Sequence, residues 1–202
     1  MSDGTVRFAI VGCGGIGPTH AKAIGSVPDA KLVAVCDVIP DRAQNMAREY
    51  SCDWYQDYGK MLERDDIDVV NICTPSGLHA EQGIMAAKAG KHVITEKPID
   101  IDLKKVDELI LTCERQGVKL ACIFQYRFTS SGRQMKQAID EGRLGRLIFG
   151  VADIKWYRKQ EYYDSAEWRG TWALDGGCLT KQGIHACLLY TSPSPRDRTR
   201  TR

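Results

Sequence analysis

The chain has 202 residues, of which 43% are hydrophobic, so it is long enough for one large or two small domains with a real core. The last sixteen residues carry four arginines and one aspartate, and the rest holds 24 basic and 25 acidic side chains, so nothing indicates nucleic-acid binding. No apolar run reaches about 18 residues, and the first apolar strand begins close to Met1, so we expect neither a membrane span nor a signal peptide.

Strands and helices alternate through the first 124 residues. In chain order the pattern predicts a strand at Val6–Val11, a helix at Ile16–Ile24, a strand at Lys31–Cys36, a helix at Asp41–Tyr50, a strand at Asp68–Cys73, a helix at Leu78–Ala89, a strand at His92–Thr95, an amphipathic helix at Leu103–Gln116 and a strand at Lys119–Phe124. Such alternation is typical of βαβ units. We therefore expect an α/β fold with a doubly wound parallel sheet.

The pattern changes after residue 124. A helix is predicted at Ser131–Glu141, and Leu147–Tyr157 forms one long apolar stretch with aromatic residues at its far end. A strand of that length favours an open antiparallel sheet over further βαβ units. Residues 125–186 are therefore interpreted as an incomplete α+β domain, separate from the domain at residues 1–124.

Residues 187–202 differ in composition from everything before them. A basic tail that contacts anionic partners and a plain disordered terminus are two interpretations. We favour a third: the string from Cys187 to Asp197 is one translated frame of a transposon-type sequencing adapter. On that interpretation the tail is non-native and the parent protein continues past Ala186.

The chain has eight cysteines and no Cys-x-x-Cys pair. Their spacing fits neither a disulfide framework nor a metal site. Buried free thiols and a reducing, cytoplasmic compartment are therefore expected.

Gly12, Gly14 and Gly17 follow the first strand and open the first helix with the spacing Gly-x-Gly-x-x-Gly. The first glycine permits a tight turn, the second lets the backbone approach a pyrophosphate, and the third lets the helix pack on the strand. Free N–H groups at the helix N-terminus favour the anion. The motif predicts that residues 1–124 are a Rossmann dinucleotide-binding domain.

Asp37 stands at the end of the second predicted strand, twenty residues after Gly17. Its carboxylate can accept hydrogen bonds from ribose hydroxyls and would repel a 2′-phosphate, so NAD is favoured over NADP. Arg42 could pair with such a phosphate, although a solvated helix residue is the more economical interpretation.

Four stretches together resemble the Gfo/Idh/MocA oxidoreductases. They are Ala9–Gly17 with His20, Cys73-Thr74-Pro75 with His79, Ala89–Val93 followed by Glu96-Lys97-Pro98, and Trp168–Trp172 followed by Gly176-Gly177 and Gln182–His185. The resemblance spans residues 6 to 186. It implies an NAD(P)-dependent enzyme that transfers a hydride between nicotinamide and a hydroxyl or ketone of a sugar, polyol or sugar derivative.

The resemblance also assigns roles to residues. Lys97 and His185 are the expected catalytic pair, and both contact substrate. Beside the resemblance, Arg127 could reach the substrate where the chain crosses between the domains, and Lys181 could contact an acidic substrate. The cofactor would be held by Gly12, Gly14, Gly15, Ile16, Gly17, Asp37, Arg42, Thr74, Pro75, His79, Glu96 and Lys97, with no metal. Burial beside an oxidised nicotinamide should lower the pKa of Lys97 towards the range useful for acid–base catalysis.

One position departs from the family pattern. Lys181 occupies the place where an Asp or Asn usually precedes the histidine by four residues. A lysine cannot accept a hydrogen bond from an imidazole, so either the proton relay differs or the substrate is acidic; a sequencing error is a third explanation. A surface salt bridge is the alternative for Arg127.

Two functions are compatible with these motifs. The first is the sugar or polyol dehydrogenase, whose full-length form is expected to be a homo-oligomer. The second is a non-catalytic dinucleotide-binding regulator of the same fold. Because the second domain is unfinished, we expect the 202-residue chain by itself to be inactive and to expose an open edge and an apolar face.

Overall fold

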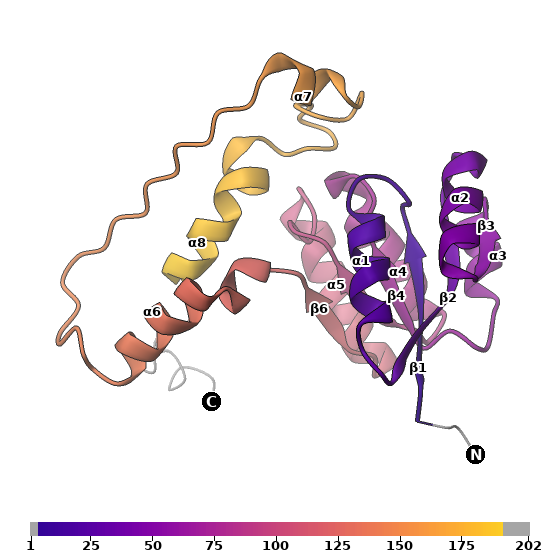
Figure 1. Cartoon of the computed structure of the whole chain (residues 1–202), viewed down its shortest axis with the longest axis horizontal. Coiled ribbons are helices and arrows are strands. Elements are labelled where there is room, and N and C mark those ends of the chain that lie inside the picture. The colour runs from indigo at the N-terminus through magenta and orange to yellow at the C-terminus, as the bar shows by residue number, and fades with distance from the viewer. Residues whose placement is uncertain (1–3, 192–202) are drawn as a thin grey trace.

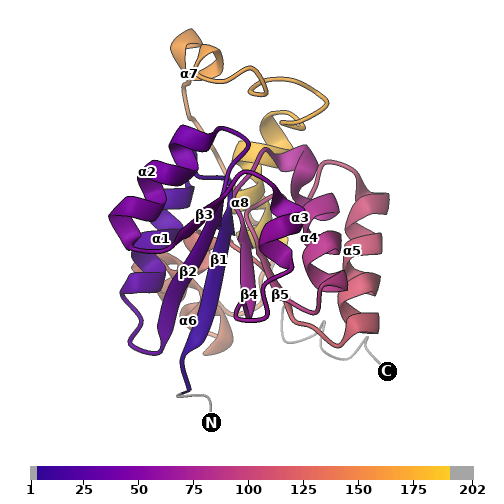
Figure 2. The ribbon, with the colours of Figure 1, turned by 90° about the vertical axis from the view of Figure 1, so that its right-hand side faces the viewer.

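The computed structural model describes residues 4–191, and its centre is a six-stranded sheet (Figures 1 and 2). The strands are all parallel and run in the order β3-β2-β1-β4-β5-β6. Their bounds are β1 Val6–Val11, β2 Ala30–Cys36, β3 Asp53–Tyr55, β4 Val69–Ile72, β5 His92–Thr95 and β6 Leu120–Cys122. The order changes direction between β1 and β4, which defines a doubly wound sheet. The predicted α/β parallel sheet is confirmed.

Helices cover both faces of this sheet (Figure 2). Ile10 points from β1 towards one face, whose core includes side chains of α1 (Gly17–Gly25) and α2 (Pro40–Tyr50). Ala9 and Val11 point to the opposite face, whose core includes side chains of α3 (Tyr58–Leu62), α4 (His79–Lys88) and α5 (Leu103–Gln116). Because both faces are buried, the central strands are mostly apolar and show no regular alternation of apolar and polar residues.

Local signals explain why the α5 prediction is confirmed to the residue. The Asp102 side chain caps the helix by accepting a hydrogen bond from the backbone N–H of Lys104 at 2.9 Å. The helix ends at Gly117, whose φ of +65° is the left-handed conformation that glycine adopts most readily.

Among the elements that were not predicted are a short strand, β3, and a short helix, α3. β3 extends the sheet by pairing with Ala34–Cys36 of β2, and α3 begins after Asp57, whose side chain accepts from the backbone N–H of Lys60 at 3.1 Å. Elements of three and five residues are too short to show a hydrophobic period.

After β6 the chain forms mostly helices. They are the 3₁₀ turn η2 (Gln125–Phe128), α6 (Ser130–Asp140), α7 (Gln160–Asp164), the π-helix η3 (Leu179–Gly183) and α8 (Ile184–Thr191). The helix predicted at Ser131–Glu141 is thus confirmed within one residue at each end.

The strand predicted at Leu147–Tyr157 was wrong for this structure. The segment carries no secondary structure, and Figure 1 shows it running alone between α6 and α7. A strand needs a neighbour to satisfy its backbone hydrogen bonds, and among residues 4–191 no strand follows β6. The apolar side chains of this segment are consequently exposed, Ile148 and Phe149 each by 84%.

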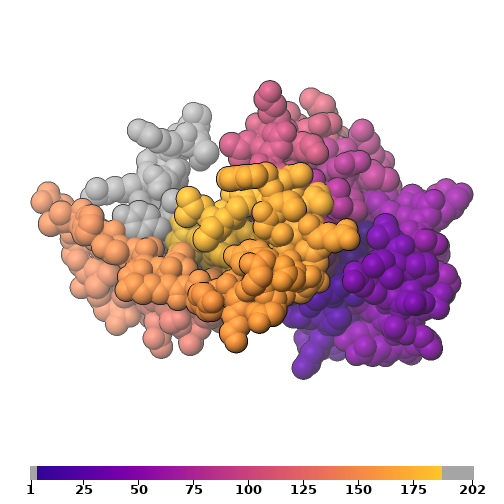
Figure 3. Space-filling model, turned by 90° about the horizontal axis from the view of Figure 1, so that it is seen from above, coloured from indigo at the N-terminus to yellow at the C-terminus, as the bar shows by residue number. Residues whose placement is uncertain are grey.

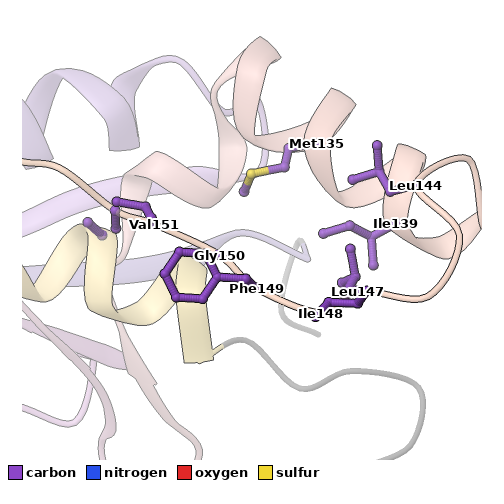
Figure 4. A pocket seen from close by; sticks show the side chains of 10 residues that line it. Met135, Ile139, Leu144, Leu147, Ile148, Phe149, Gly150 and Val151 are labelled. Carbon is purple, nitrogen blue, oxygen red and sulfur yellow. The ribbon is translucent and has the colours of Figure 1, made fainter.

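An apolar groove of about 520 Å³ lies between α6, this extended segment and α8 (Figure 4). It is lined by Met135, Ile139, Leu144, Leu147, Ile148, Phe149, Gly150, Val151, Ala152 and Ala186. The groove contains none of the predicted site residues. An exposed apolar face was expected in this part of the chain.

The predicted burial of the cysteines holds for half of them. Each of the eight cysteines is a free thiol; Cys13, Cys36, Cys73 and Cys113 are buried, whereas the other four are at least partly exposed. Most of the predicted non-native tail, residues 192–202, lies outside the described residues. Within residues 4–191, no helix has both the length and the apolarity to cross a membrane.

Replacing Leu109 by Ala tests the packing of α5. Leu109 is fully buried, and its methyl groups lie 2.9–3.1 Å from where a Cβ on Gly83 would stand. Because the cavity would be lined by rigid sheet and helix, we expect the free energy of unfolding in urea to fall by about 2–5 kcal/mol. Ile110→Ala, at a 37% exposed neighbour on the same helix, is the control and should cost less. Equal losses would contradict the packing.

Candidate functional site

The glycine-rich loop between β1 and α1 is shaped by its backbone contacts. Gly12 has φ +94°, and a Cβ there would lie 2.7 Å from the carbonyl group of Cys73. A Cβ on Gly17 would lie 2.5 Å from the Gly12 carbonyl oxygen. By contrast, a Cβ on Gly14 or Gly15 would meet nothing within 4 Å. The outer glycines therefore let the loop fold, and the inner ones keep an open surface on which a pyrophosphate can approach the backbone.

The start of α1 is also open. Ile16 precedes the helix and supplies no side-chain cap, and Pro18 stands in the first turn. No side chain thus competes for the N–H groups at this end, which favours an anion there.

Asp37 lies beside this loop at the carboxyl end of β2. Its two carboxylate oxygens accept hydrogen bonds at 2.8 Å from the backbone N–H groups of Cys13 and Ile39. The side chain is only 7% exposed, so it is fixed in place. Each oxygen retains a lone pair for a ribose hydroxyl, so the loop and Asp37 together fit a dinucleotide. Burial, and after it the negative charge of Asp37, raises the pKa of the Cys13 thiol to about 12.

The loop after β4 forms the other wall at the switch point of the sheet. Thr74 donates from its hydroxyl to the Gln82 side chain at 2.5 Å. His79 is 1% exposed, and its ring nitrogens lie 2.8 Å from the Thr74 carbonyl oxygen and 2.7 Å from that of Pro98. The structure places His79 behind this loop, where it joins the Thr74 and Pro98 segments, while Thr74 and Pro75 lie on the loop itself.

A buried polar network that sequence reasoning missed lies under Lys97. Asn71 Nδ2 is 3.0 Å from His20 Nδ1, and His20 Nε2 is 3.0 Å from Glu96 Oε1. The other oxygen of Glu96 accepts from the backbone N–H of Lys97 at 3.2 Å. Burial raises the pKa of Glu96, but the hydrogen bond and charge of His20 outweigh it and hold the pKa below its usual value. The missed signal was Asn71, a polar residue inside the apolar strand β4.

Lys97 stands at the carboxyl end of β5, where the chain passes through a cis Lys97–Pro98 peptide. Its ammonium donates to the backbone carbonyl oxygen of Lys181 at 2.7 Å. Burial lowers the pKa of Lys97; Glu96 opposes that shift, and the charge of Lys181 adds to it. The direction agrees with the lowering that burial was expected to cause.

The segment that carries Lys181 docks directly on the sheet edge. Figure 3 shows it, in orange to yellow, against the Rossmann part of the molecule. The backbone N–H of Gly77 donates to the Leu174 carbonyl at 3.1 Å, and a Cβ on Gly77 would lie 2.5 Å from the Ala173 carbonyl oxygen. Gly176 packs as closely on Ile101. These contacts bring the segment at residues 173–176 against the loops that follow β4 and β5.

His185 completes the group at the start of α8. It is 6% exposed, and its ring stacks on Tyr126 with centroids 4.4 Å apart. Its Nδ1 has no hydrogen-bond partner among the described residues. Burial lowers its pKa first and the charge of Lys97 lowers it further, so the neutral, proton-accepting ring is favoured.

Lys181 is buried, and its ammonium pairs with Asp175. The same ammonium lies 3.8 Å from the centroid of the Trp168 ring, a cation–π contact. The carboxylate and the aromatic face therefore compensate the cost of burying this charge.

The remaining predicted residues lie further out. Arg42 is exposed on α2, and Arg127 is exposed on η2 next to Tyr126. Among residues 4–191, no three His, Cys, Asp or Glu side chains gather in a way that could hold a metal ion.

Comparison with known families divides the chain in two. Residues 6–124 match the model of an oxidoreductase family with an NAD-binding Rossmann fold, GFO_IDH_MocA. Residues 133–191 match the GFO/IDH/MocA C-terminal domain.

Individual relatives agree with this match. An inositol 2-dehydrogenase of Rhizobium meliloti is 39% identical over 71% of this chain and 43% of its own length. The scyllo-inositol 2-dehydrogenase (NAD(+)) of Bacillus subtilis is 37% identical over 71% of this chain and 43% of its own. The WlbA dehydrogenase of Bordetella pertussis, solved with NADH and UDP-GlcNAcA, superimposes with a TM-score of 0.89 at 36% identity, over 94% of this chain and 57% of that one. The chain spans less than half the length of the curated relatives it matches.

Two glycine substitutions separate folding from cofactor binding. Gly12→Ala should lower the free energy of unfolding by at least about 1–3 kcal/mol, because alanine at φ +94° is strained and its Cβ overlaps Cys73. Gly14→Ala should leave stability nearly unchanged but weaken NADH binding about tenfold or more, or about 1.4 kcal/mol, since its Cβ occupies only open space. Urea unfolding and NADH fluorescence titration measure the two effects. Unchanged NADH affinity in Gly14→Ala would exclude the loop as the pyrophosphate site.

The lowered pKa of Lys97 can be measured without turnover. Only the neutral amine reacts with acetic anhydride, so the rate of trace acetylation at Lys97, read by mass spectrometry, follows its titration. A lowered pKa shifts the midpoint below 10.5, the ordinary lysine value. Lys181→Met removes one neighbouring positive charge and should move the midpoint upwards. A midpoint at or above 10.5 in the chain without substitutions would refute the claim that burial lowers the pKa of Lys97.

Proposed function

The chain belongs to the Gfo/Idh/MocA oxidoreductase family, whose Rossmann domain binds NAD, and from this premise we propose that the whole protein oxidises or reduces a sugar, polyol or sugar derivative at a CH–OH group. One observation carries the proposal. At the switch point of the sheet, a lysine with a lowered pKa and a neutral histidine with a free ring nitrogen lie together. The dehydrogenase and NADH names of its relatives support the same reaction class.

Bound NAD supplies the hydride acceptor or donor for this reaction. In the oxidation direction Lys97 takes the proton of the substrate hydroxyl, and its lowered pKa favours the neutral amine that this step needs. The Lys181 carbonyl orients the amine by accepting one of its hydrogens. In the reduction direction the protonated Lys97 returns the proton to the oxygen.

His185 is proposed as the second proton carrier. Stacking on Tyr126 fixes its ring plane, and the unpartnered Nδ1 is free to accept a proton. Arg127 and Lys181 are proposed to lie on the substrate side. Asp37, the glycine loop with Ile16, Thr74, Pro75, His79, Glu96 and Arg42 are proposed for the cofactor side, with NAD preferred because the carboxylate of Asp37 repels a 2′-phosphate.

The same proposal covers the organisation of the whole protein. Residues 1–124 form the cofactor domain, 125–186 begin the substrate and oligomerisation domain, and 187–202 are non-native. Leu147–Tyr157 becomes a strand of an open antiparallel sheet once a neighbouring strand is supplied. The whole protein is proposed to form homo-oligomers in the cytoplasm.

A Lys97→Met variant tests the assigned chemistry. The whole protein is expressed from the gene as it stands in the source DNA. It is assayed with NAD⁺ and a panel of inositols and sugars, and NADH formation is followed by absorbance at 340 nm. We expect turnover to fall by about 10²–10⁴-fold, the usual contribution of a general base, with little change in NADH affinity. Lys105→Met, at an exposed position on α5, should keep full activity.

Two results would argue against this proposal. Turnover that persists in Lys97→Met would exclude Lys97 as the proton carrier. NADH binding without turnover on any substrate in the panel would favour the non-catalytic regulator.

A further inference from the structure

Asn71 is a polar residue at a position where packing alone would favour an apolar one. The rest of β4 is apolar, yet Asn71 is only 4% exposed. Its Nδ2 reaches His20 Nδ1, whereas its Oδ1 is buried and has no hydrogen-bond partner among the described residues. A buried oxygen without a donor destabilises a fold. The placement of this amide therefore indicates a role other than stability.

The amide of Asn71 sets the state of the His20 ring. Because an amide nitrogen can only donate, His20 Nδ1 accepts and the ring hydrogen stands on Nε2. Nε2 then donates to Glu96 Oε1 at 3.0 Å, and Glu96 Oε2 accepts from the backbone N–H of Lys97 at 3.2 Å. His20 and Glu96 are each 8% exposed, so little water competes for these bonds. We call Asn71, His20 and the two hydrogen bonds to the carboxylate the Glu96 tether.

The tether keeps apart two opposite charges that lie on neighbouring residues. The Lys97 ammonium donates to the Lys181 carbonyl, and among residues 4–191 it forms no ion pair with a carboxylate. Glu96 favours the charged form of Lys97 without touching the ammonium. A carboxylate in contact with it would raise the pKa of Lys97 strongly, so the amine would keep its proton.

The other titratable groups that face Lys97 are already occupied or neutral. The carboxylate of Asp175 pairs with Lys181. Burial lowers the pKa of His185 and raises that of Cys122 to about 12, which favours the neutral form of both. Burial also raises the pKa of Cys73, which faces Glu96. Glu96 is therefore the carboxylate that would pair with the ammonium if it were released.

We propose that His20, held by Asn71, is a positioning residue that keeps the Glu96 carboxylate off the Lys97 ammonium. The amine then stays available to take the proton of a substrate hydroxyl, while the charge of Glu96 limits how far burial favours the neutral form. This inference rests on the proposed function, in which Lys97 carries the proton. It gives a part in the reaction to two residues that act through Glu96.

Trace acetylation of Lys97 tests the tether in the 202-residue chain without turnover. His20→Leu removes the donor to Glu96, so the carboxylate can pair with the ammonium, and the titration midpoint of Lys97 should rise by about one pH unit or more. Glu96→Gln removes the charge and should lower the midpoint. The double variant should have the midpoint of Glu96→Gln alone, because the effect of His20 requires the charge of Glu96.

Three further variants separate positioning from packing. His20→Gln keeps an N–H that can donate to Glu96 and should restore the midpoint of the parent chain. Asn71→Leu should raise the midpoint without lowering the free energy of unfolding in urea, because it removes an oxygen that has no donor. It also provides the test should His20→Leu fail to fold. Thr112→Val, at a buried polar residue on α5 outside the tether, is the matched control and should leave the midpoint unchanged.

In the whole protein the tether should show in the pH profile of turnover. Lys97 must be neutral to take the proton, so the rate of oxidation rises with pH through the pKa of Lys97 and then reaches a plateau. His20→Leu should move this rise to higher pH, which lowers turnover about tenfold for each pH unit of the move, and should leave the plateau unchanged. A purely structural role would lower the plateau instead.

Several outcomes would overturn the inference. One is a midpoint that falls or stays in place in a folded His20→Leu chain. Another is a rise that persists in the double variant, because His20 would then not act through Glu96. Midpoints that shift as expected in a protein without turnover would support the tether but refute the proposed function.

Discussion

The hydrogen bond from the Lys97 ammonium to the Lys181 carbonyl joins the two parts of the chain at the place where their chemistry meets. Lys97 is fixed by the parallel sheet, because it stands two residues after the end of β5 and its backbone N–H donates to the Glu96 side chain. Lys181 belongs to a segment that reaches the carboxyl-terminal edge of the sheet through close packing of Gly77 on Ala173 and of Gly176 on Ile101. Without that docking, Lys97 would keep its place but lose its acceptor, its burial and its histidine neighbour.

Electrostatics at this edge depend on which charges are buried together. Glu96 is stabilised by His20 from below and favours the charged form of Lys97, whereas desolvation and Lys181 favour the neutral form. The lowering of the Lys97 pKa is thus the outcome of opposing effects, and burial is the largest of them. The pairing of Lys181 with Asp175 limits the repulsion between the two lysines. Lys181, the residue that departs from the family pattern, thus has a structural role through its ion pair with Asp175.

The sequence predicted structure correctly where the signal came from residues close together in the chain. The glycine spacing, Asp37 and the capped helix α5 each depend on residues close in the chain, and the structure has them where they were predicted. The Asn71–His20–Glu96 network and the Asp175–Lys181 pair escaped prediction because tertiary packing, and not spacing, brings their members together. The strand at Leu147–Tyr157 failed for the opposite reason: its apolar pattern is local, but a strand exists only with a partner.

The central claim is that a bound cofactor would have its nicotinamide end at the Lys97–His185 group and its adenosine end near Asp37. Intermolecular nuclear Overhauser effects on the isotope-labelled 202-residue chain with NADH test this directly. The account predicts contacts from the nicotinamide protons to the side chains of Lys97 and His185 or Tyr126, and from the adenine ribose to the residues around Asp37. Adenosine contacts at Asp37 accompanied by nicotinamide contacts elsewhere would contradict it.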